Sequence, residues 1–269
     1  MSTLFLVHAH PDDEAIMTGG VMQKAHQAGH RVVLVTSTRG EVGEIHNMDE
    51  AETRPKLAEV RTAELAAAAR ILGVDRQEFL DYRDSGMAGT DDNQNPASYH
   101  LAPLEQAAER LAAILREERP EVVVTYDPTG TYFHPDHIKA HQVTTTALDL
   151  LKGEGWEPRK FYWHGFPRSG LKAWAELSTR PDAPEPPSFP PNMGVPDEEI
   201  TTVVDVRPFV DGKLSAFKAH LSQNGPEAFF LSTPAELRER AFGEEHFVLA
   251  RGELGAPRPE PDLFAGVGG

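Results

Sequence analysis

The sequence of 269 residues predicts an α/β fold built on a doubly wound, mostly parallel sheet. Strand-like and helix-like segments alternate over about the first 150 residues, which is typical of parallel strands joined by right-handed helical crossovers. The strand-like runs are also continuously apolar, as expected for strands that helices cover on both faces.

Two strand–helix–strand units open the chain. Their strands are predicted at 4–7, 31–36 and 79–82, and their helices around 21–25 and over 56–72. The second helix stops at Gly73, a residue that suits the left-handed position at a helix end. A third helix is predicted over 101–119, where Pro120 halts it, and the most strand-like run of the chain follows at 121–126. Pro135 occupies a first-turn position, so the next helix is expected over 136–151.

Beyond Tyr162 the pattern weakens. Prolines crowd the stretch at about 180–196, which predicts a long loop because proline fits neither a helix interior nor a central strand. The elements expected after this loop are a strand at 201–206, helices at 210–222 and 234–242, and a strand at 245–250. We therefore divide the chain into a core of residues 1–165 and a smaller C-terminal α/β portion of residues 166–269.

The charge and apolar content limit the partners of the chain. Its 26 Lys and Arg residues against 42 Asp and Glu residues give a net charge of −16, the wrong sign for binding nucleic acid or an anionic lipid surface. No apolar run approaches the ~20 residues that span a bilayer, and the N-terminus lacks the pattern of a secretory signal. We expect a cytoplasmic protein that binds neither nucleic acid nor membranes. Its size is compatible with a homo-oligomer.

The absence of cysteine narrows the chemistry further. It removes disulfides, thiolate nucleophiles, Fe–S clusters and cysteine-bound zinc together. A metal site in this chain must therefore use His, Asp or Glu.

Two clusters of His and Asp residues each follow a strand of the buried type. The first is His8-Ala9-His10-Pro11-Asp12-Asp13-Glu14, and the second lies within the run from Tyr126 to His137. Ligands of open α/β sheets bind beyond the carboxyl ends of the strands, so both clusters are expected at one edge. Imidazoles and carboxylates that converge there favour a metal site.

A zinc ion without cysteine requires three ligands of the His and carboxylate type and an open position for water. We expect His10, Asp13 and His137 to hold Zn²⁺, with Fe²⁺ as the alternative for the same donors. The metal would lower the pKa of its bound water to about 7. Asp12, left unligated beside it, would accept the proton of that water as general base.

Three further residues are expected to assist. His134 would act as a second acid or electrostatic partner, and Tyr132 would donate to the developing oxyanion. Asp136 would orient His134. The competing interpretation of each His-Pro-Asp copy is a turn whose Asp caps the next helix. His137 and His141 are also spaced like a zincin ligand pair, although no Glu base lies between them.

Together these segments resemble a known family. His10-Pro11-Asp12-Asp13-Glu14 paired with His134-Pro135-Asp136-His137 is similar to the PIG-L/LmbE-like family of zinc-dependent deacetylases. The resemblance continues through 38–44, the helix that carries Arg61, and 83–90, and it covers roughly residues 4–165. The chain looks most like the branch that deacetylates N-acetylglucosaminyl conjugates in mycothiol or bacillithiol biosynthesis, and like the related mycothiol S-conjugate amidases.

This resemblance implies a Rossmann-like sheet and the same roles for the two clusters. It adds three substrate-binding residues, Arg61, Asp84 and Glu44, and it implies that the C-terminal portion completes the substrate pocket. The expected function is a metal-dependent hydrolase that removes the N-acetyl group from an N-acetylglucosaminyl small molecule. A thiol S-conjugate amidase on the same scaffold is the alternative.

Two rivals come from other classes of protein. A non-haem Fe(II) oxygenase also uses two His and one carboxylate, but it usually needs a jelly-roll scaffold, which the alternation of strands and helices contradicts. A sugar-binding protein without catalysis would keep the pocket, but the presence of Asp12 and His134 beside the ligands argues against it.

Overall fold

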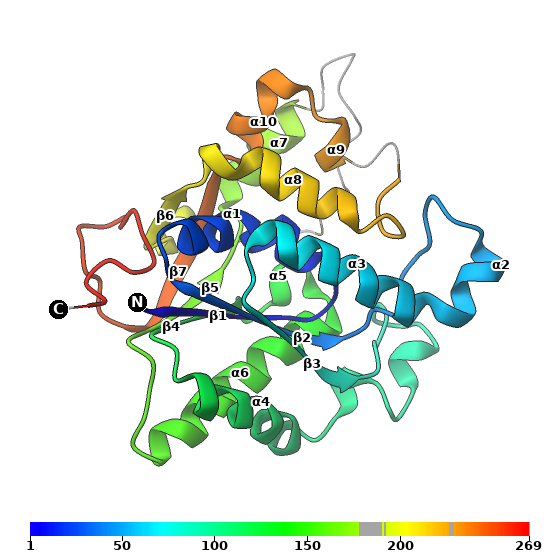
Figure 1. Cartoon of the computed structure of the whole chain (residues 1–269), viewed down its shortest axis with the longest axis horizontal. Coiled ribbons are helices and arrows are strands. Elements are labelled where there is room, and N and C mark those ends of the chain that lie inside the picture. The colour runs from blue at the N-terminus through cyan, green and yellow to red at the C-terminus, as the bar shows by residue number, and fades with distance from the viewer. Residues whose placement is uncertain (178–189, 191, 226–228, 269) are drawn as a thin grey trace.

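A seven-stranded sheet organises the part of the chain that the computed structural model describes, residues 1–177, 190, 192–225 and 229–268. Its strands are β1 (Thr3–His8), β2 (Arg31–Thr38), β3 (Arg76–Tyr82), β4 (Val122–Tyr126), β5 (Lys160–His164), β6 (Thr202–Asp205) and β7 (Glu244–Gly252). They lie in the order β3-β2-β1-β4-β5-β7-β6 (Figure 1). The strands from β1 to β5 pair in parallel, and β7 pairs antiparallel with both β5 and β6.

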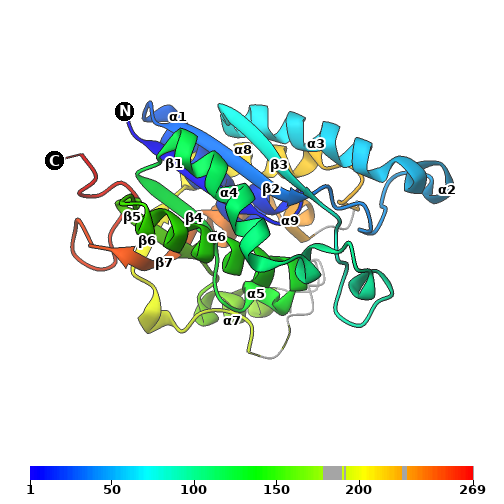
Figure 2. The ribbon, with the colours of Figure 1, turned by 90° about the horizontal axis from the view of Figure 1, so that it is seen from below.

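Helices cover both faces of the sheet. One face carries α1 (Asp13–Gln27), α3 (Leu57–Leu72) and α8 (Val210–Ala219), and the other carries α4 (Leu104–Glu118) and α6 (Pro135–Gly153), as Figure 1 and Figure 2 show. The remaining helices are α2 (Glu50–Thr53), α5 (Gly130–Phe133), α7 (Arg168–Leu177), α9 (Phe229–Ser232) and α10 (Ala235–Phe242). Each face buries its own apolar cluster, one around Leu111 and Val143, the other around Leu65 and Phe217. The predicted doubly wound α/β fold is confirmed.

Two helix ends lie at the residues that were expected to set them, and the start of another helix differs. α3 ends at Gly73, whose φ of 75° is left-handed, and Pro135 is the first residue of α6. α4 begins at Leu104 rather than at residue 101. The reason is Pro103, because the residue before a proline is pushed into an extended conformation, and Ala102 has a ψ of 139°.

The C-terminal portion joins the same sheet through β6 and β7, and four of its elements lie where the sequence predicted them. α7 and α9 in this portion are additional to the predicted elements, as are α2, α5 and β5 in the core. α8 ends at Ala219, three residues before the expected end, because the chain turns at His220. Most of the proline-rich stretch predicted at about 180–196 lies outside the described residues. In the described part of the chain, every helix is too short or too polar to cross a bilayer.

Candidate metal centre and active site

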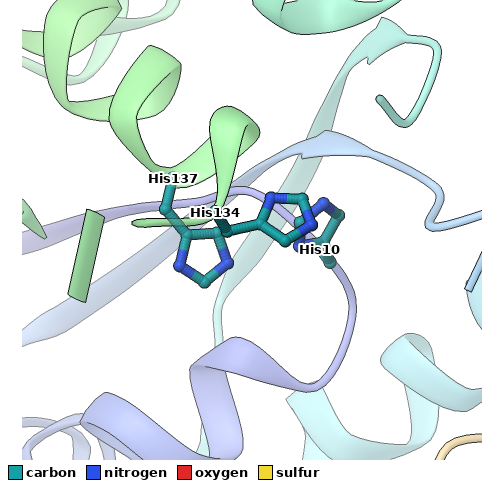
Figure 3. A group of neighbouring side chains, drawn as sticks. All are labelled: His10, His134 and His137. Atoms are coloured by element: carbon teal, nitrogen blue, oxygen red, sulfur yellow. The ribbon is translucent and has the colours of Figure 1, made fainter. Parts of the chain in front are cut away.

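The two His and Asp clusters meet at the carboxyl ends of β1 and β4, which are neighbours in the sheet. β1 leads into the turn that carries His10, and β4 leads to His134 and to His137 on the first turn of α6. Figure 3 shows the three imidazoles side by side. The ring centroid of His10 lies 4.6 Å from that of His134 and 5.3 Å from that of His137.

Asp13 lies at a metal-ligand spacing from each of the two predicted histidine ligands. Asp13 Oδ2 lies 3.4 Å from His10 Nδ1 and 3.3 Å from His137 Nε2. Donors placed tetrahedrally at roughly 2.0–2.2 Å from zinc are themselves about 3.3–3.5 Å apart. His137 is fully buried, and neither of its ring nitrogens has a hydrogen-bond partner within the described residues. A bound cation would satisfy such an orphaned nitrogen, so the residues present fit a metal ion.

The groupings in the described part of the chain whose donor atoms all lie within 4.8 Å of one another differ from the predicted set, because neither contains Asp13. One joins His10 to His134 and His137, and the other joins His10 to Asp84 and Asp136. In the first, His134 already uses its Nδ1 atom, which accepts a hydrogen bond from the Asp136 N–H at 3.1 Å. In the second, His10 presents Nε2, which lies 3.2 Å from Asp136 Oδ2 and 3.6 Å from Asp84 Oδ1. His10 therefore turns Nδ1 toward Asp13 and Nε2 toward the other two carboxylates.

Asp13 is held by groups that the sequence did not single out. The Tyr126 hydroxyl donates to Asp13 Oδ2 at 2.6 Å and accepts from the Ala9 N–H at 2.7 Å. The His10 N–H donates to the same oxygen at 2.9 Å. Burial alone would raise the pKa of the Asp13 carboxyl, but the facing imidazoles of His137 and His10 hold it well below its usual range. Asp13 is therefore an anion fixed in one orientation.

Asp12 does not cap the helix that follows it. Its side chain makes no capping hydrogen bond to α1 and instead lies 3.1 Å from Arg61 Nη2. Burial raises the pKa of the Asp12 carboxyl to about 6, against the opposing effect of the Arg61 charge. The turn-and-cap interpretation thus fails for this copy of the motif, and the carboxylate is free to act as a base near neutral pH.

The second copy of the motif also differs from a simple cap. His134 is the N-cap residue of α6, and because its Nδ1 accepts a hydrogen bond, the proton of the neutral ring lies on Nε2. Burial and the neighbouring His10 and His137 lower the pKa of His134 to about 2, so the imidazole is neutral rather than protonated. The ring of Tyr132 stands edge-on to those of His137 and His134, with centroids 4.8 and 5.9 Å away.

Asp136 was expected to orient His134, but its carboxylate points elsewhere. It accepts hydrogen bonds from the Ser85 N–H at 2.9 Å and from the Ser85 hydroxyl, and it contacts His10 Nε2. Only the backbone N–H of Asp136 reaches His134. The carboxylate therefore orients His10, because Ser85, from the loop after β3, draws it toward that side of the cluster.

A cavity of about 220 Å³ opens beside this cluster. It is lined by His10, Asp12, Val42, Gly43, Glu44, Arg61, Asp84, Gly86, Met87, Tyr132, His134 and Gln223. All three residues that the family resemblance assigned to substrate binding are in this set. A second cavity, of about 370 Å³, lies around Trp174 and Phe242 and contains none of the predicted site residues.

The three predicted substrate-binding residues differ in their surroundings. Arg61 is buried and donates to the carbonyl oxygens of Gly40, at 2.8 Å, and Pro11. Asp84 is also buried and accepts from the Gly86 N–H at 2.9 Å. Glu44 is exposed at the rim of the cavity. Arg61 and Asp84 thus form a fixed polar wall, while Glu44 stands in solvent.

The remaining histidines near the site are accounted for by other contacts. His141 Nδ1 lies 2.9 Å from the carbonyl oxygen of Tyr126, and the ring faces Trp163, so His141 does not join His137 as a ligand pair. His8 Nε2 lies 2.8 Å from Thr18 Oγ1 inside the core. Sequence reasoning missed Tyr126 as a partner of Asp13 and Gln223 as a lining residue. Tyr126 is the last residue of β4, the strand that leads into the second cluster. No local signal marks Gln223.

Comparison with known proteins identifies the family. Residues 5–148 match the family model described as PIG-L, GlcNAc-PI de-N-acetylase. The 1D-myo-inositol 2-acetamido-2-deoxy-alpha-D-glucopyranoside deacetylase of Acidothermus cellulolyticus is 42% identical over 98% of this chain and 95% of its own length. The protein of the same name from Streptomyces avermitilis is 41% identical over 98% of this chain and 97% of its own length.

A solved structure is similar to this chain in fold. The N,N'-diacetylchitobiose deacetylase from Pyrococcus horikoshii matches with a TM-score of 0.63 and 22% identity, over 92% of this chain and 83% of that one. The family model, which matches more than half of the chain, and the relatives of about 40% identity show that the chain belongs to the PIG-L family. It is accordingly a deacetylase, an enzyme that hydrolyses an amide, and the predictions of family and enzyme class are confirmed.

Proposed function

We propose that the enzyme removes the N-acetyl group from an N-acetylglucosaminyl inositol conjugate and releases acetate and a free amine. The relatives that match almost the whole chain are named for this type of substrate. The observation that carries the proposal is the position of Asp13 Oδ2, within 3.4 Å of both His10 Nδ1 and His137 Nε2, next to the Asp12 carboxylate.

We propose that His10, Asp13 and His137 hold the catalytic metal, Zn²⁺ or Fe²⁺. When bound there, the divalent cation lowers the pKa of a coordinated water to about 7 and polarises the acetyl carbonyl. Asp136 fixes the His10 ring through Nε2, and Tyr126 fixes the Asp13 carboxylate. Such supporting contacts set the orientation of ligand side chains.

The other polar groups of the site move the proton and stabilise charge. Asp12 accepts the proton of the attacking water, and Arg61 holds the Asp12 carboxylate at the cavity wall. A neutral His134 donates its Nε2 proton in a hydrogen bond to the developing oxyanion, together with the Tyr132 hydroxyl. The proton taken by Asp12 is the one that the departing amine nitrogen requires.

The cavity around these groups suits a hydroxyl-rich substrate. Asp84 and Arg61 present charged hydrogen-bonding groups on its wall, and Glu44 stands at its rim. Sugar and inositol hydroxyls are both donors and acceptors, so they match a wall of this kind. Gln223 comes from the portion after residue 165, and we propose that this portion completes the pocket.

An amine-release assay on N-acetylglucosaminyl inositol tests the proposal. The wild-type protein should release one amine per acetate, and Asp12→Asn should keep one metal ion per chain while losing roughly 10²–10⁴-fold in turnover. His141→Asn is the matched control, because His141 lies one turn after His137 on α6 but outside the cluster. It should keep both metal and activity. A wild-type protein that releases no amine, or an unimpaired Asp12→Asn protein, would refute the proposal.

A further inference from the structure

We propose that Glu14 and His220 are positioning residues that hold the backbone of Asp12 in the conformation needed for catalysis. The inference rests on the proposed function, in which Asp12 is the general base. Neither residue lines the cavity beside the His and Asp cluster. Their contacts instead lead from the C-terminal portion of the chain to the peptide bond that precedes Asp12.

Asp12 has a backbone conformation that residues other than glycine rarely adopt. Its φ is 109° and its ψ is −33°. A non-glycine residue keeps such a conformation only when its surroundings hold it there, and such residues gather at active sites. The conformation therefore requires specific contacts in the folded protein.

Two hydrogen bonds hold the peptide group between Pro11 and Asp12, one at its N–H and one at its carbonyl oxygen. The Asp12 N–H donates to Glu14 Oε2 at 2.9 Å, and the Pro11 carbonyl oxygen accepts from the Arg61 guanidinium. The same guanidinium lies 3.1 Å from Asp12 Oδ2. Rotation of this peptide would break both hydrogen bonds and release the backbone conformation of Asp12, whose carboxylate the same guanidinium contacts.

Glu14 can serve in this way only if its own carboxylate is satisfied. Glu14 is fully buried, and its second oxygen, Oε1, lies 2.6 Å from His220 Nε2. His220 is fully buried as well. A buried carboxylate that lost this partner would be costly and would turn or take up a proton. His220 therefore acts on Asp12 through Glu14.

The position of His220 is itself fixed from α3. His220 follows the end of α8, which packs against both α1 and α3. Two residues later, Ser222 donates to Glu64 through its N–H at 2.7 Å and through its hydroxyl at 2.6 Å. Glu64 and Arg61 both lie on α3. The two hydrogen bonds to the Pro11–Asp12 peptide thus come from α1 and α3, and α8 packs against both helices.

The test compares kcat, KM and metal content in four variants of the full chain. Glu14→Ala and His220→Leu remove the contacts, whereas Glu14→Gln and His220→Gln keep an amide able to form them. We expect kcat to fall about 10–100-fold in the first two, with KM and metal per chain unchanged within about twofold. The two Gln variants should recover most of the lost kcat. A crystal structure of Glu14→Ala should show Asp12 with a negative φ.

Glu245 provides a matched control. Its buried carboxylate accepts from the N–H groups of Gly20 and Val21 on α1, at 2.8 and 2.9 Å, and pairs with Lys213 at 2.7 Å. It ties α1 to the C-terminal portion as Glu14 does, but it makes no contact with Asp12. Glu245→Gln should therefore lose stability and keep kcat. Equal losses of kcat in Glu245→Gln and Glu14→Ala would overturn the positioning role.

A double-variant experiment separates positioning from a general structural effect. If Glu14 acts through the base, Glu14→Ala should cause no further loss of kcat in an Asp12→Asn background. A further loss there of the same factor as in the wild-type background would overturn the inference. Should Glu14→Ala fail to fold, His220→Leu carries the same test. Absence of amine release by the wild-type protein would instead reject the proposed function itself.

Discussion

Replacing Tyr126 with phenylalanine tests whether Asp13 is a metal ligand. Tyr126 is fully buried, and phenylalanine keeps the ring that stacks on His137, with centroids 4.1 Å apart. The substitution removes only the hydroxyl, which donates to Asp13 Oδ2 and accepts from the Ala9 N–H. A buried N–H without an acceptor costs about 1–3 kcal/mol, and a hydrogen bond to a charged group contributes about 1.5–3 kcal/mol. Because one hydroxyl makes both contacts, we expect a loss of about 3 kcal/mol in the free energy of unfolding.

The same substitution should weaken metal binding. Loss of a group that orients a ligand typically reduces metal affinity 10–100-fold, so the Kd for Zn²⁺ should rise by that factor. Competition with a chromophoric chelator measures the Kd, and urea unfolding of the metal-free protein measures stability.

Tyr162→Phe is the control for this experiment. Tyr162 is another fully buried tyrosine, and its hydroxyl donates to Glu260, away from the His and Asp cluster. This variant should lose stability and keep its affinity for Zn²⁺. Unchanged zinc affinity in Tyr126→Phe, together with the expected loss of stability, would refute the assignment of Asp13 as a ligand.

Three more outcomes are expected. Chelation should abolish turnover and one equivalent of Zn²⁺ or Fe²⁺ should restore it, and full activity after chelation would exclude a metal mechanism. Burial lowers the pKa of His164 to about 4, so the unfolded chain binds a proton below about pH 6.5 that the folded protein excludes. The free energy of unfolding therefore decreases as the pH falls from about 6.5 toward 4, by about 2 kcal/mol at pH 5. Urea titrations at pH 7 and pH 5 measure this difference in the wild-type protein, and in His164→Asn the difference should be smaller by the same amount. Gly130 has a φ of 65°, and a Cβ there would lie 2.7 Å from the Ile138 nitrogen, so Gly130→Ala should lose more than about 1 kcal/mol and weaken metal binding through α6. Gly155→Ala, with a φ of 88° and open space around it, should lose stability alone.

The elements that the sequence predicts are those whose signals lie within the element. The end of α3 at Gly73 and the start of α6 at Pro135 follow from the backbone preferences of single residues. β5 has no such end signal, although its three consecutive aromatic residues at 161–163 favour a strand. It is a five-residue strand whose ladder partners are β4 on one side and the antiparallel β7 on the other. Those partners are far away in the sequence, so the aromatic run is the local feature that marks this strand.

The same distinction applies to the site. The donor atoms of His10, Asp13 and His137 come together as the order of two adjacent strands predicts, although their binding of a metal remains a prediction. The direction of the Asp136 carboxylate could not be predicted, because it depends on Ser85, 51 residues away. The contact between Glu14 and His220 joins positions 206 residues apart. Burial of both groups, which only the fold determines, makes that contact necessary.

Both loops of the site combine a strained backbone with a nearby carboxylate. In the first loop, Asp12 has a φ of 109° and its N–H donates to Glu14. In the second, Thr131 has a φ of 66° and its N–H donates to Asp127 Oδ2 at 2.9 Å. A chain that must leave a strand and begin a helix within a few residues needs such sharp turns, and an acidic side chain that accepts from the turn's own N–H can stabilise them locally. The acidic residues of the two clusters therefore have two kinds of task, and only the direction of each carboxylate in the folded chain tells a turn-holding acid from one that faces the cavity.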